Sequence, residues 1–560
     1  MLADDVLDTM HANAHEPIVI GAARRYELSG DSVFASIAEN FHEVLTTEHT
    51  YSTGNGNHGE YWTAPGRLGD TLDGNTQESC TSYNLLKLDK HLMSWQDAAS
   101  DASLNYAEHY ERLFTNGIMS TMDSSRVGAF IYMLPLSTVN GSSKGFGDPL
   151  YSMTCCYGTG IETHAKLGDT IFAHQDSGAA SGAPTFAVIQ YHSATATWSP
   201  PGATFTITQT VEWNDISLTL SVTLNVVVSG ATSAPTATVQ LRVPSWVDAS
   251  AGGSLAVNGV AVNGSPFPPL TWALVSRAWS LGTGDTVTAF FPIAPVRLEY
   301  VKDDRAEYDN TVAVLSGPFM LVAPSVHGSA LAGDASKPAS WIKPVSAAKR
   351  SALASLAAGG GGAGFFVRHD ENDLAPEGMG MSVGAVDPTR DTQGPDASFI
   401  VMSPGLSGVV GSASIEAANW PGFYVCACRG TAAGSPLVLI DPGVMVNNAT
   451  AADCSFAQHS PGLSGVNGSL SFELLTSAGS FVSWFGGGGA LTVQPLKAGD
   501  ANFANMTSWL PVAPVWTFPS FSFVAEPTAA ARSSSVTRAF LLYPIAFAVT
   551  ETYVAHFQIV

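Results

Sequence analysis

The segment Glu78–Trp95 reads Glu-Ser-Cys-Thr-Ser-Tyr-Asn-Leu-Leu-Lys-Leu-Asp-Lys-His-Leu-Met-Ser-Trp. Its apolar residues recur at spacings of three and four, which is the period of a helix with one buried face. The same period marks the neighbouring segments Glu16–Leu28, Ser32–Leu45, Ala98–Asn116 and Gly158–Phe172. Paired helices joined by long loops at one end predict an array or toroid of helical hairpins over residues 1–175.

From about Thr185 the period of the apolar residues changes to two. Phe205-Thr-Ile-Thr-Gln-Thr-Val and Leu218-Thr-Leu-Ser-Val-Thr-Leu alternate β-branched and polar residues, as strands with one solvated face do. Further strands are expected at Thr236–Val243, Thr286–Phe291 and Val312–Val322. Short strands separated by turn residues predict a β-sandwich.

A repeat marks the third part of the chain. Ser398-Phe-Ile-Val-Met-Ser-Pro-Gly-Leu-Ser-Gly-Val returns as Ser455-Phe-Ala-Gln-His-Ser-Pro-Gly-Leu-Ser-Gly-Val. Units of this size are too small to bury their own apolar face and must pack against one another. The repeat therefore favours a β-trefoil.

The composition excludes two classes of partner. The 560 residues carry a formal net charge of −23, so no basic surface for nucleic acid is visible. The apolar stretch Ala539–Val549 is interrupted by Pro544 and is about half the roughly 20 residues that a membrane helix needs. We therefore expect neither a nucleic-acid nor a membrane partner, and the sequence leaves the oligomeric state open.

The first residues do not form a signal peptide. Met1-Leu-Ala-Asp-Asp-Val places two acidic residues where basic ones are expected, and no apolar segment follows. Either the protein is cytosolic or the chain begins downstream of its true start. Five Asn-x-Ser/Thr tripeptides are compatible with secretion: Asn140, Asn263, Asn448, Asn467 and Asn505.

Cysteines and one carboxylate form a candidate metal site. Glu78-x-Cys80 begins one predicted helix and the pair Cys155-Cys156 precedes another. Three thiols and a carboxylate provide the four ligands of a tetrahedral zinc ion, whose sulfur atoms would lie roughly 4 Å apart. Each cysteine taken alone is more typical of a buried, small apolar residue, because the C-x₂-C spacing of common zinc sites is missing, so both interpretations stay open.

A second candidate lies in the loop Gly59-Glu60-Tyr61-Trp62. Glycine, aromatic rings and a carboxylate together suit a sugar site, where a carboxyl group moves protons. A solvated surface role for Glu60 is the alternative. His11 lies on a predicted helix and is placed either to bond a substrate hydroxyl or to be a satisfied structural residue.

Four motifs in order along the chain resemble glycoside hydrolase family 127 and its close relatives. They are Gly-Glu60-Tyr-Trp, Glu78-Ser-Cys80-Thr-Ser-Tyr-Asn-Leu-Leu-Lys-Leu, Tyr132-x-x-Pro-Leu and Cys155-Cys156-Tyr-Gly-Thr-Gly-Ile-Glu. The resemblance covers roughly residues 1–350 and the final strand near Ala539–Phe557. It implies a β-L-arabinofuranosidase with an (α/α)6-barrel followed by β-sandwich modules.

The same resemblance implies roles for individual residues. Cys155 matches the nucleophile that attacks the anomeric carbon, and Glu60 matches the general acid/base. Glu78, Cys80 and Cys156, with Cys155 itself, match the zinc ligands, whereas Tyr132 and His11 match positions that contact substrate. A free thiol has a pKa near 8.5, and metal coordination deprotonates it, so a thiolate shared with zinc is available as a nucleophile.

The repeats resemble the arabinose-binding family 42 carbohydrate-binding module. Glu416-Ala-Ala-Asn-Trp-Pro-Gly-Phe-Tyr-Val carries the likeness, and its second copy, Glu473-Leu-Leu-Thr-Ser-Ala-Gly-Ser-Phe-Val, lacks the aromatic-Pro pair. Three further cysteines, Cys426, Cys428 and Cys454, fall in this module. A structural disulfide and a free thiol both remain open for them.

These observations predict a multidomain α + β chain. We expect the C-terminal part of an (α/α)6-barrel at 1–178, a β-sandwich at 179–345, a linker and irregular region at 346–394, a β-trefoil at 395–530, and a final strand at 531–560 that returns to the sandwich. The family's barrel has twelve helices and the sequence predicts five or six. The chain is therefore expected to start midway through the barrel, with a signal peptide upstream.

The expected function is that of a secreted or vacuolar enzyme that acts on arabinose-containing glycans. It would be a zinc-dependent retaining glycoside hydrolase that releases terminal L-arabinofuranose from plant-type glycans through a cysteine nucleophile. The alternative is a non-catalytic carbohydrate-binding protein whose truncated barrel is inert.

Overall fold

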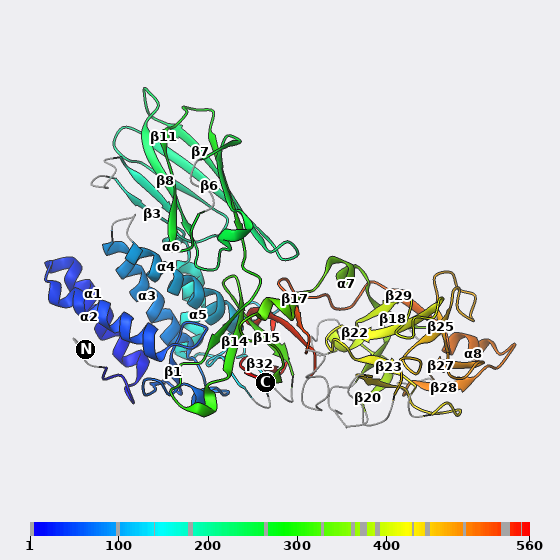
Figure 1. Cartoon of the computed structure of the whole chain (residues 1–560). Helices are drawn as coiled ribbons and strands as arrows, with labels where there is room; N and C mark the ends of the chain where they lie inside the picture. The colour runs from blue at the N-terminus through cyan, green and yellow to red at the C-terminus, as the bar shows by residue number, and fades with distance from the viewer. Residues whose placement is uncertain are drawn as a thin grey trace. The chain divides into compact units, whose positions relative to one another are not determined.

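The computed structural model divides the chain into two compact units, residues 1–329 with 543–559 and residues 330–542 with 560 (Figure 1). It describes all residues except 1–4, 97–100, 139–140, 177–182, 263–266, 326–329, 360–363, 370–377, 387–392, 428–429, 443–448, 485–488, 528–537 and 550. The architecture is multidomain α + β, as the sequence predicts. Within the described residues, every helix is too short or too polar to cross a membrane.

Helices form the first layer of the first unit (Figure 1). They are α1 (Ala12–Ser29), α2 (Ser32–Val44), α3 (Ser79–Trp95), α4 (Asp101–Leu113), α5 (Cys155–Lys166) and α6 (Gly168–Ile171). Between α1 and α2, Gly30 adopts a left-handed φ of 71° and the Asp31 carboxylate caps the Val33 amide, which reverses the chain. The predicted helical period is confirmed, because Leu85, Leu88 and Leu92 of α3 are all buried in the helical core.

Two β-sheets follow in the same unit. A six-stranded sheet runs in the order β10-β9-β12-β7-β6-β5, and a four-stranded sheet runs β11-β8-β4-β3. The strands are β3 (Phe172–Gln175), β4 (Thr185–Val188), β5 (Ala194–Trp198), β6 (Thr204–Asn214), β7 (Thr219–Ser229), β8 (Thr236–Val243), β9 (Ser254–Val257), β10 (Val260–Ala261), β11 (Thr271–Ala278) and β12 (Asp285–Pro292). The predicted period of two is confirmed in β7, where alternate residues from Leu220 to Val228 are buried. Phe186 of β4 and Trp198 of β5 pack ring against ring at 5.7 Å between the sheets.

A further group of strands holds the end of the chain. β14 (Thr311–Ser316) and β15 (Phe319–Pro324) form a hairpin, and β13 (Arg297–Tyr300) pairs with β14. β32 (Tyr553–Val554) pairs with β15, and β33 (Phe557–Ile559) pairs with β14. Residues 553–559 thus pair with β14 and β15, which belong to a sheet separate from the two described above.

The second unit contains three sets of four strands. The sets are β18 (Leu353–Ala358), β19 (Phe365–His369), β20 (Met379–Ala385) and β21 (Phe399–Met402); β22 (Ser412–Ala417), β23 (Tyr424–Cys426), β24 (Val438–Ile440) and β25 (Phe456–His459); and β26 (Ser471–Leu474), β27 (Ser480–Ser483), β28 (Thr492–Pro495) and β29 (Trp509–Val512). Equivalent hydrogen bonds recur between sets: the Leu406 and Leu463 amides donate to Ser414 Oγ and Ser471 Oγ, both at 2.9 Å. β29 pairs with β18, so the last set meets the first.

The stretch 346–394 differs from the expected linker. It contains β18, β19 and β20, which pair with β21, β24 and β29. Small residues resemble linker composition, but in strands they permit close packing, and Leu356 and Val383 of this stretch are buried in the core. Its residues 360–363, 370–377 and 387–392 lie outside the described part of the chain.

The buried His556 makes the stability of the first unit sensitive to acid. Burial lowers its pKa to about 4, although Nδ1 lies 3.3 Å from the Leu136 carbonyl. Between pH 6.5 and 4 the unfolded chain therefore binds a proton that the folded chain does not, and stability falls as the pH falls. At pH 5 the loss is about 2 kcal/mol. Urea unfolding of wild type and His556→Asn at pH 7.5 and pH 5 measures it: wild type should lose more stability, and equal losses would contradict this assignment.

Candidate functional site

The N-termini of α3 and α5 meet at one place in the first unit. Glu78 is the N-cap of α3, and Cys80 lies in the first turn of that helix. Cys155 and Cys156 open α5. A helix N-terminus carries partial positive charge and therefore favours negative charge nearby. All four side chains, one carboxylate and three thiols, can become anions.

Buried asparagines fix the start of α3. The Glu78 amide donates to Asn57 Oδ1 at 3.0 Å, and Asn55 Nδ2 donates to the Glu78 carbonyl at 3.0 Å. On the other side, the Ser79 amide donates to the Tyr132 carbonyl at 3.2 Å. The loop that contains Glu60 and the segment that contains Tyr132 are therefore both held against the end of α3.

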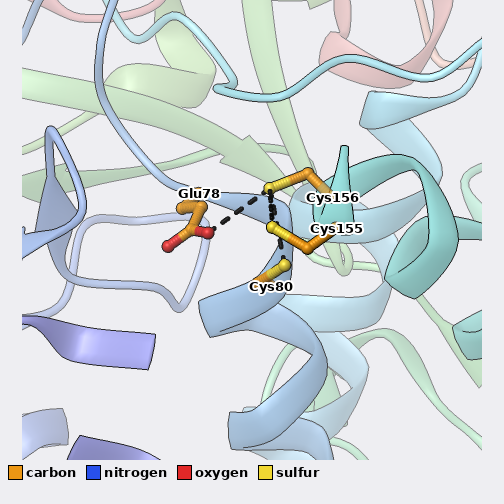
Figure 2. Close-up of side chains that lie close together, drawn as sticks. All are labelled: Glu78, Cys80, Cys155 and Cys156. Atoms are coloured by element: carbon orange, nitrogen blue, oxygen red, sulfur yellow. Dashed lines mark hydrogen bonds between the residues drawn. The ribbon is translucent and has the colours of Figure 1, made fainter. Parts of the chain in front are cut away.

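The three thiols and Glu78 converge (Figure 2). Cys80 Sγ lies 3.4 Å from Cys156 Sγ, which lies 3.9 Å from Cys155 Sγ. Cys156 Sγ donates to Glu78 Oε1 at 3.3 Å, and the ligand atoms of all four residues lie within 4.8 Å of one another. The distances agree with the separation expected from the sequence, across a gap of more than 70 residues in the chain.

The crowded thiols do not ionise equally. The contact with Cys156 lowers the pKa of Cys80, whereas the same contact and burial raise the pKa of Cys156. Burial also raises the pKa of Cys155, and burial raises the pKa of Glu78, with the nearby negative charge of Glu60 adding to the effect. The cluster thus makes Cys80 the most acidic of the three thiols.

Glu60 occupies a strained turn. β1 (Asn57–His58) and β2 (Tyr61–Trp62) form a two-residue hairpin whose turn residues, Gly59 and Glu60, have φ of 52° and 75°. Two positive φ values are typical of a type I′ turn, in which the second position usually holds glycine. A glutamate there costs about 1 kcal/mol or more, and such strain is concentrated at functional sites.

The other two predicted site residues contact Glu60. Tyr132 Oη donates to Glu60 Oε1, and His11 Nε2 lies 3.1 Å from Glu60 Oε2. His11 Nδ1 accepts from the Ala14 amide at 3.3 Å, so the ring proton is on Nε2 and that nitrogen donates to Glu60. The sequence analysis predicted that Tyr132 and His11 contact substrate. In the structure, both contact the Glu60 carboxylate and orient it.

Two residues beside the thiols were missed by the sequence analysis. Thr159 Oγ1 lies 3.3 Å from Cys80 Sγ, one helical turn after Cys155 on α5. Glu16 of α1 is 2% exposed, and its pKa is raised well above the usual value by burial and by Glu78. The i, i+4 spacing from Cys155 could have pointed to Thr159, whereas no local signal links Glu16 to the cluster.

The second unit contains a polar cluster that the sequence analysis did not place. His369 Nε2 lies 3.1 Å from Asn419 Oδ1 and 3.4 Å from Asp396 Oδ1, and Asn419 Nδ2 donates to Asp396 at 2.9 Å. Nearby in the sequence, Trp420 is buried. The disulfide Cys426–Cys454 answers one question that the sequence left open, and Cys428 lies outside the described residues.

Comparison with known families bears on the helical part of the chain. The model of the β-L-arabinofuranosidase GH127 catalytic domain matches residues 2–169. The helical region is similar to this catalytic domain. The matched range contains all seven predicted site residues.

Relatives match the chain over parts of their length. Alpha-L-arabinofuranosidase 43 from Humicola insolens is 36% identical over 88 residues, which are 16% of this chain and 17% of that enzyme. Ara127N-Se, a GH127 β-L-arabinofuranosidase from Geobacillus stearothermophilus T6, is 19% identical, with a TM-score of 0.44, over 71% of this chain and 54% of its own. A further GH127 β-arabinofuranosidase is 14% identical, with a TM-score of 0.46, over 90% and 61%. The chain spans little more than half of these solved chains.

The exposure of the thiols predicts an order of chemical modification. Cys155 is exposed, whereas Cys80 and Cys156 are buried. In chelator-treated protein, iodoacetamide should modify Cys155 roughly tenfold or more faster than the other two, because access limits thiol reactivity even where a thiolate is present. Peptide mass spectrometry over time measures the three rates. Equal rates, or faster labelling of Cys156, would contradict the geometry.

Proposed function

We propose that the chain is a zinc-dependent retaining glycoside hydrolase that releases terminal L-arabinofuranose from plant-type glycans. The observation that carries the proposal is the gathering of three thiols and Glu78 at two helix N-termini, within a region similar to the GH127 catalytic domain. Glu60, a second carboxylate, lies close enough to Glu78 to raise its pKa. A nucleophile and a proton donor are the two groups that a retaining mechanism needs.

The donor set fits a zinc ion. Sulfur ligands are typical of zinc, and Glu78, Cys80, Cys155 and Cys156 supply four ligands in reach of one another. When bound, the metal would keep the thiols ionised at neutral pH, which the crowded cluster does not do by itself. The 3.4 Å approach of Cys80 Sγ to Cys156 Sγ supports this proposal, since a cation stabilises several negative charges at such short separations.

Cys155 is the thiol suited to attack. It is exposed, whereas Cys80 and Cys156 are buried and act as ligands only. Its sulfur forms a bond to the anomeric carbon as the bond to the leaving oxygen breaks, and Glu60 gives its proton to that oxygen. Glu60 then takes a proton from water, whose oxygen displaces the sulfur, so that two inversions retain the configuration.

Tyr132 and His11 hold Glu60 for this exchange. Tyr132 donates to Oε1 and His11 donates to Oε2, which keeps both oxygens oriented. The His11 contact is the longer and is partly exposed, with 37% of that side chain accessible. We therefore assign the exchanged proton to Oε2, while Tyr132 continues to fix Oε1.

The finer fold and location belong to the same proposal. We propose that α1–α6 form part of an (α/α)6-type barrel and that the three strand sets of the second unit form a β-trefoil of the family 42 type. The disulfide Cys426–Cys454 and two exposed Asn-x-Ser/Thr sites, Asn467 and Asn505, support a secreted or vacuolar location. Arabinose-containing glycans are the proposed partners.

A carbohydrate-binding protein without activity is the second candidate. The cluster of His369, Asp396 and Asn419 favours it, because convergent polar side chains and an aromatic residue, here Trp420 directly after Asn419, are typical of ligand sites. Zinc analysis together with turnover of a chromogenic β-L-arabinofuranoside separates the two. Glycan binding with neither zinc nor turnover would leave the second candidate and remove the first.

Substitution of the thiols tests their separate roles. Cys155→Ala should abolish turnover, and Cys155→Ser should be little better, because an alcohol is not ionised at neutral pH. Cys80→Ala should lose both zinc and activity, since it removes a buried ligand. Metal content and initial rates give the readouts. An active Cys155→Ala enzyme would remove Cys155 as nucleophile.

Glu60→Gln tests the proton transfer. It should lose about 10²–10⁴-fold in rate on substrates whose poor leaving group needs protonation, and much less on activated aryl glycosides. It should retain zinc, because Glu60 is not a ligand. Glu162→Gln, an exposed glutamate of α5 that pairs with Lys166, is the matched control and should keep its rate. Wild-type rates for Glu60→Gln on unactivated substrates would exclude Glu60.

A further inference from the structure

A second cluster of metal-ligating side chains lies inside the helical layer. It consists of His42 of α2, Asp89 of α3 and His109 of α4, all of them buried. Asp89 is eleven residues beyond Glu78 in the sequence, which is about 16 Å along a helix. The cluster is therefore separate from the thiol site, and none of its residues takes part in the mechanism proposed above.

The ligand atoms of this cluster converge. His42 Nε2 lies 3.0 Å from Asp89 Oδ1, and His109 Nδ1 lies 2.8 Å from Asp89 Oδ2. All three ligand atoms lie within 4.8 Å of one another. Atoms that share a tetrahedral zinc ion at about 2.1 Å are roughly 3.4 Å apart, so a small side-chain rotation opens the required space.

The hydrogen bond on the far side of His109 fixes its proton. His109 Nε2 lies 2.8 Å from the Gly54 carbonyl, which only accepts, so Nε2 carries the hydrogen. Nδ1 then faces the Asp89 carboxylate, 3.0 Å from Oδ1 and 2.8 Å from Oδ2, and either a proton or a metal ion lies between them. A metal-ligating histidine characteristically donates its other nitrogen to a carbonyl in this way.

His42 offers a second lone pair to the same centre. Its Nε2 is buried and, despite its 3.0 Å approach to Asp89, lacks hydrogen-bond geometry among the described residues. The rings of His42 and His109 lie 5.0 Å apart, edge to face, so two charged imidazoliums would repel each other there.

We propose that His42 Nε2, Asp89 and His109 Nδ1 bind a second zinc ion that joins α2, α3 and α4. Two imidazoles and one carboxylate are a three-ligand set that zinc accepts with a water in the fourth position. Room for that water is present, because His42 and His109 border a cavity of about 560 Å³. The same cavity is lined by Glu39, Glu43 and Glu108 and by Arg112 and Lys302, so acidic side chains outnumber basic ones around the site.

Metal counting on the full-length chain tests the proposal. The triple-alanine variant, with Cys80, Cys155 and Cys156 changed to Ala, lacks the thiol site and should retain about one equivalent of zinc. Adding Asp89→Asn to this variant should abolish the remaining zinc binding. The matched control is Asp285→Asn, another buried aspartate, in the sandwich, and it should leave the zinc in place. If the triple-alanine variant is folded by circular dichroism and still holds no zinc after loading, the proposal is wrong.

Cobalt substitution in the otherwise unchanged chain gives a second readout if the triple-alanine variant fails to fold. Asp89→Asn should lose one equivalent of Co²⁺ and its visible d–d absorption, while the near-ultraviolet sulfur-to-cobalt band of the thiol site stays. Equal cobalt content in wild type and Asp89→Asn would show that protons alone hold His42, Asp89 and His109 together.

Discussion

The meeting of two helix N-termini is the constraint on which the site depends. Cys80 and Cys156 come within 3.4 Å only because α3 and α5 begin side by side, with Glu78 capping the first of them. The aligned peptide dipoles favour negative charge at this place, so a cluster that would repel itself elsewhere is tolerated. Asn55 and Asn57 hold the N-terminus of α3 by hydrogen bonds to the Glu78 backbone. This explains why the loop before α3 has buried polar residues.

The helical layer is also tied to the sandwich by a buried ion network. Arg242 of β8 is fully buried and forms ion pairs with Glu108 and Glu111 of α4, while the Trp246 indole donates to Glu111 at 2.8 Å. A buried arginine is tolerated only when its donors are matched in this way. The network holds α4, which contains His109, against the sheet of β8. The position of α4 in the helical core therefore depends partly on contacts with that sheet.

The backbone strain of the hairpin at Glu60 is offset by contacts of its side chain. The turn would be relaxed with glycine at the second position, yet it holds a glutamate with φ of 75°. Tyr132 and His11 hold the carboxylate from two sides, which compensates for the backbone cost and leaves one orientation. Pre-organisation of this kind suits the proton exchange that we propose for Glu60.

The sequence alone determined the helical and strand periods and the repeat of the second unit, because each depends on residue types at short spacings, and its motifs singled out the four residues that cluster, Glu78, Cys80, Cys155 and Cys156. It could not determine that residues 346–394 form strands, since Ala and Gly carry little periodic signal, nor the pairing of Cys426 with Cys454. The contacts of Glu60 with Tyr132 and His11, the burial of Glu16, and the convergence of His42, Asp89 and His109 were decided by the tertiary structure alone. These residues come from different elements, and only the packing of the helices brings them within hydrogen-bond distance.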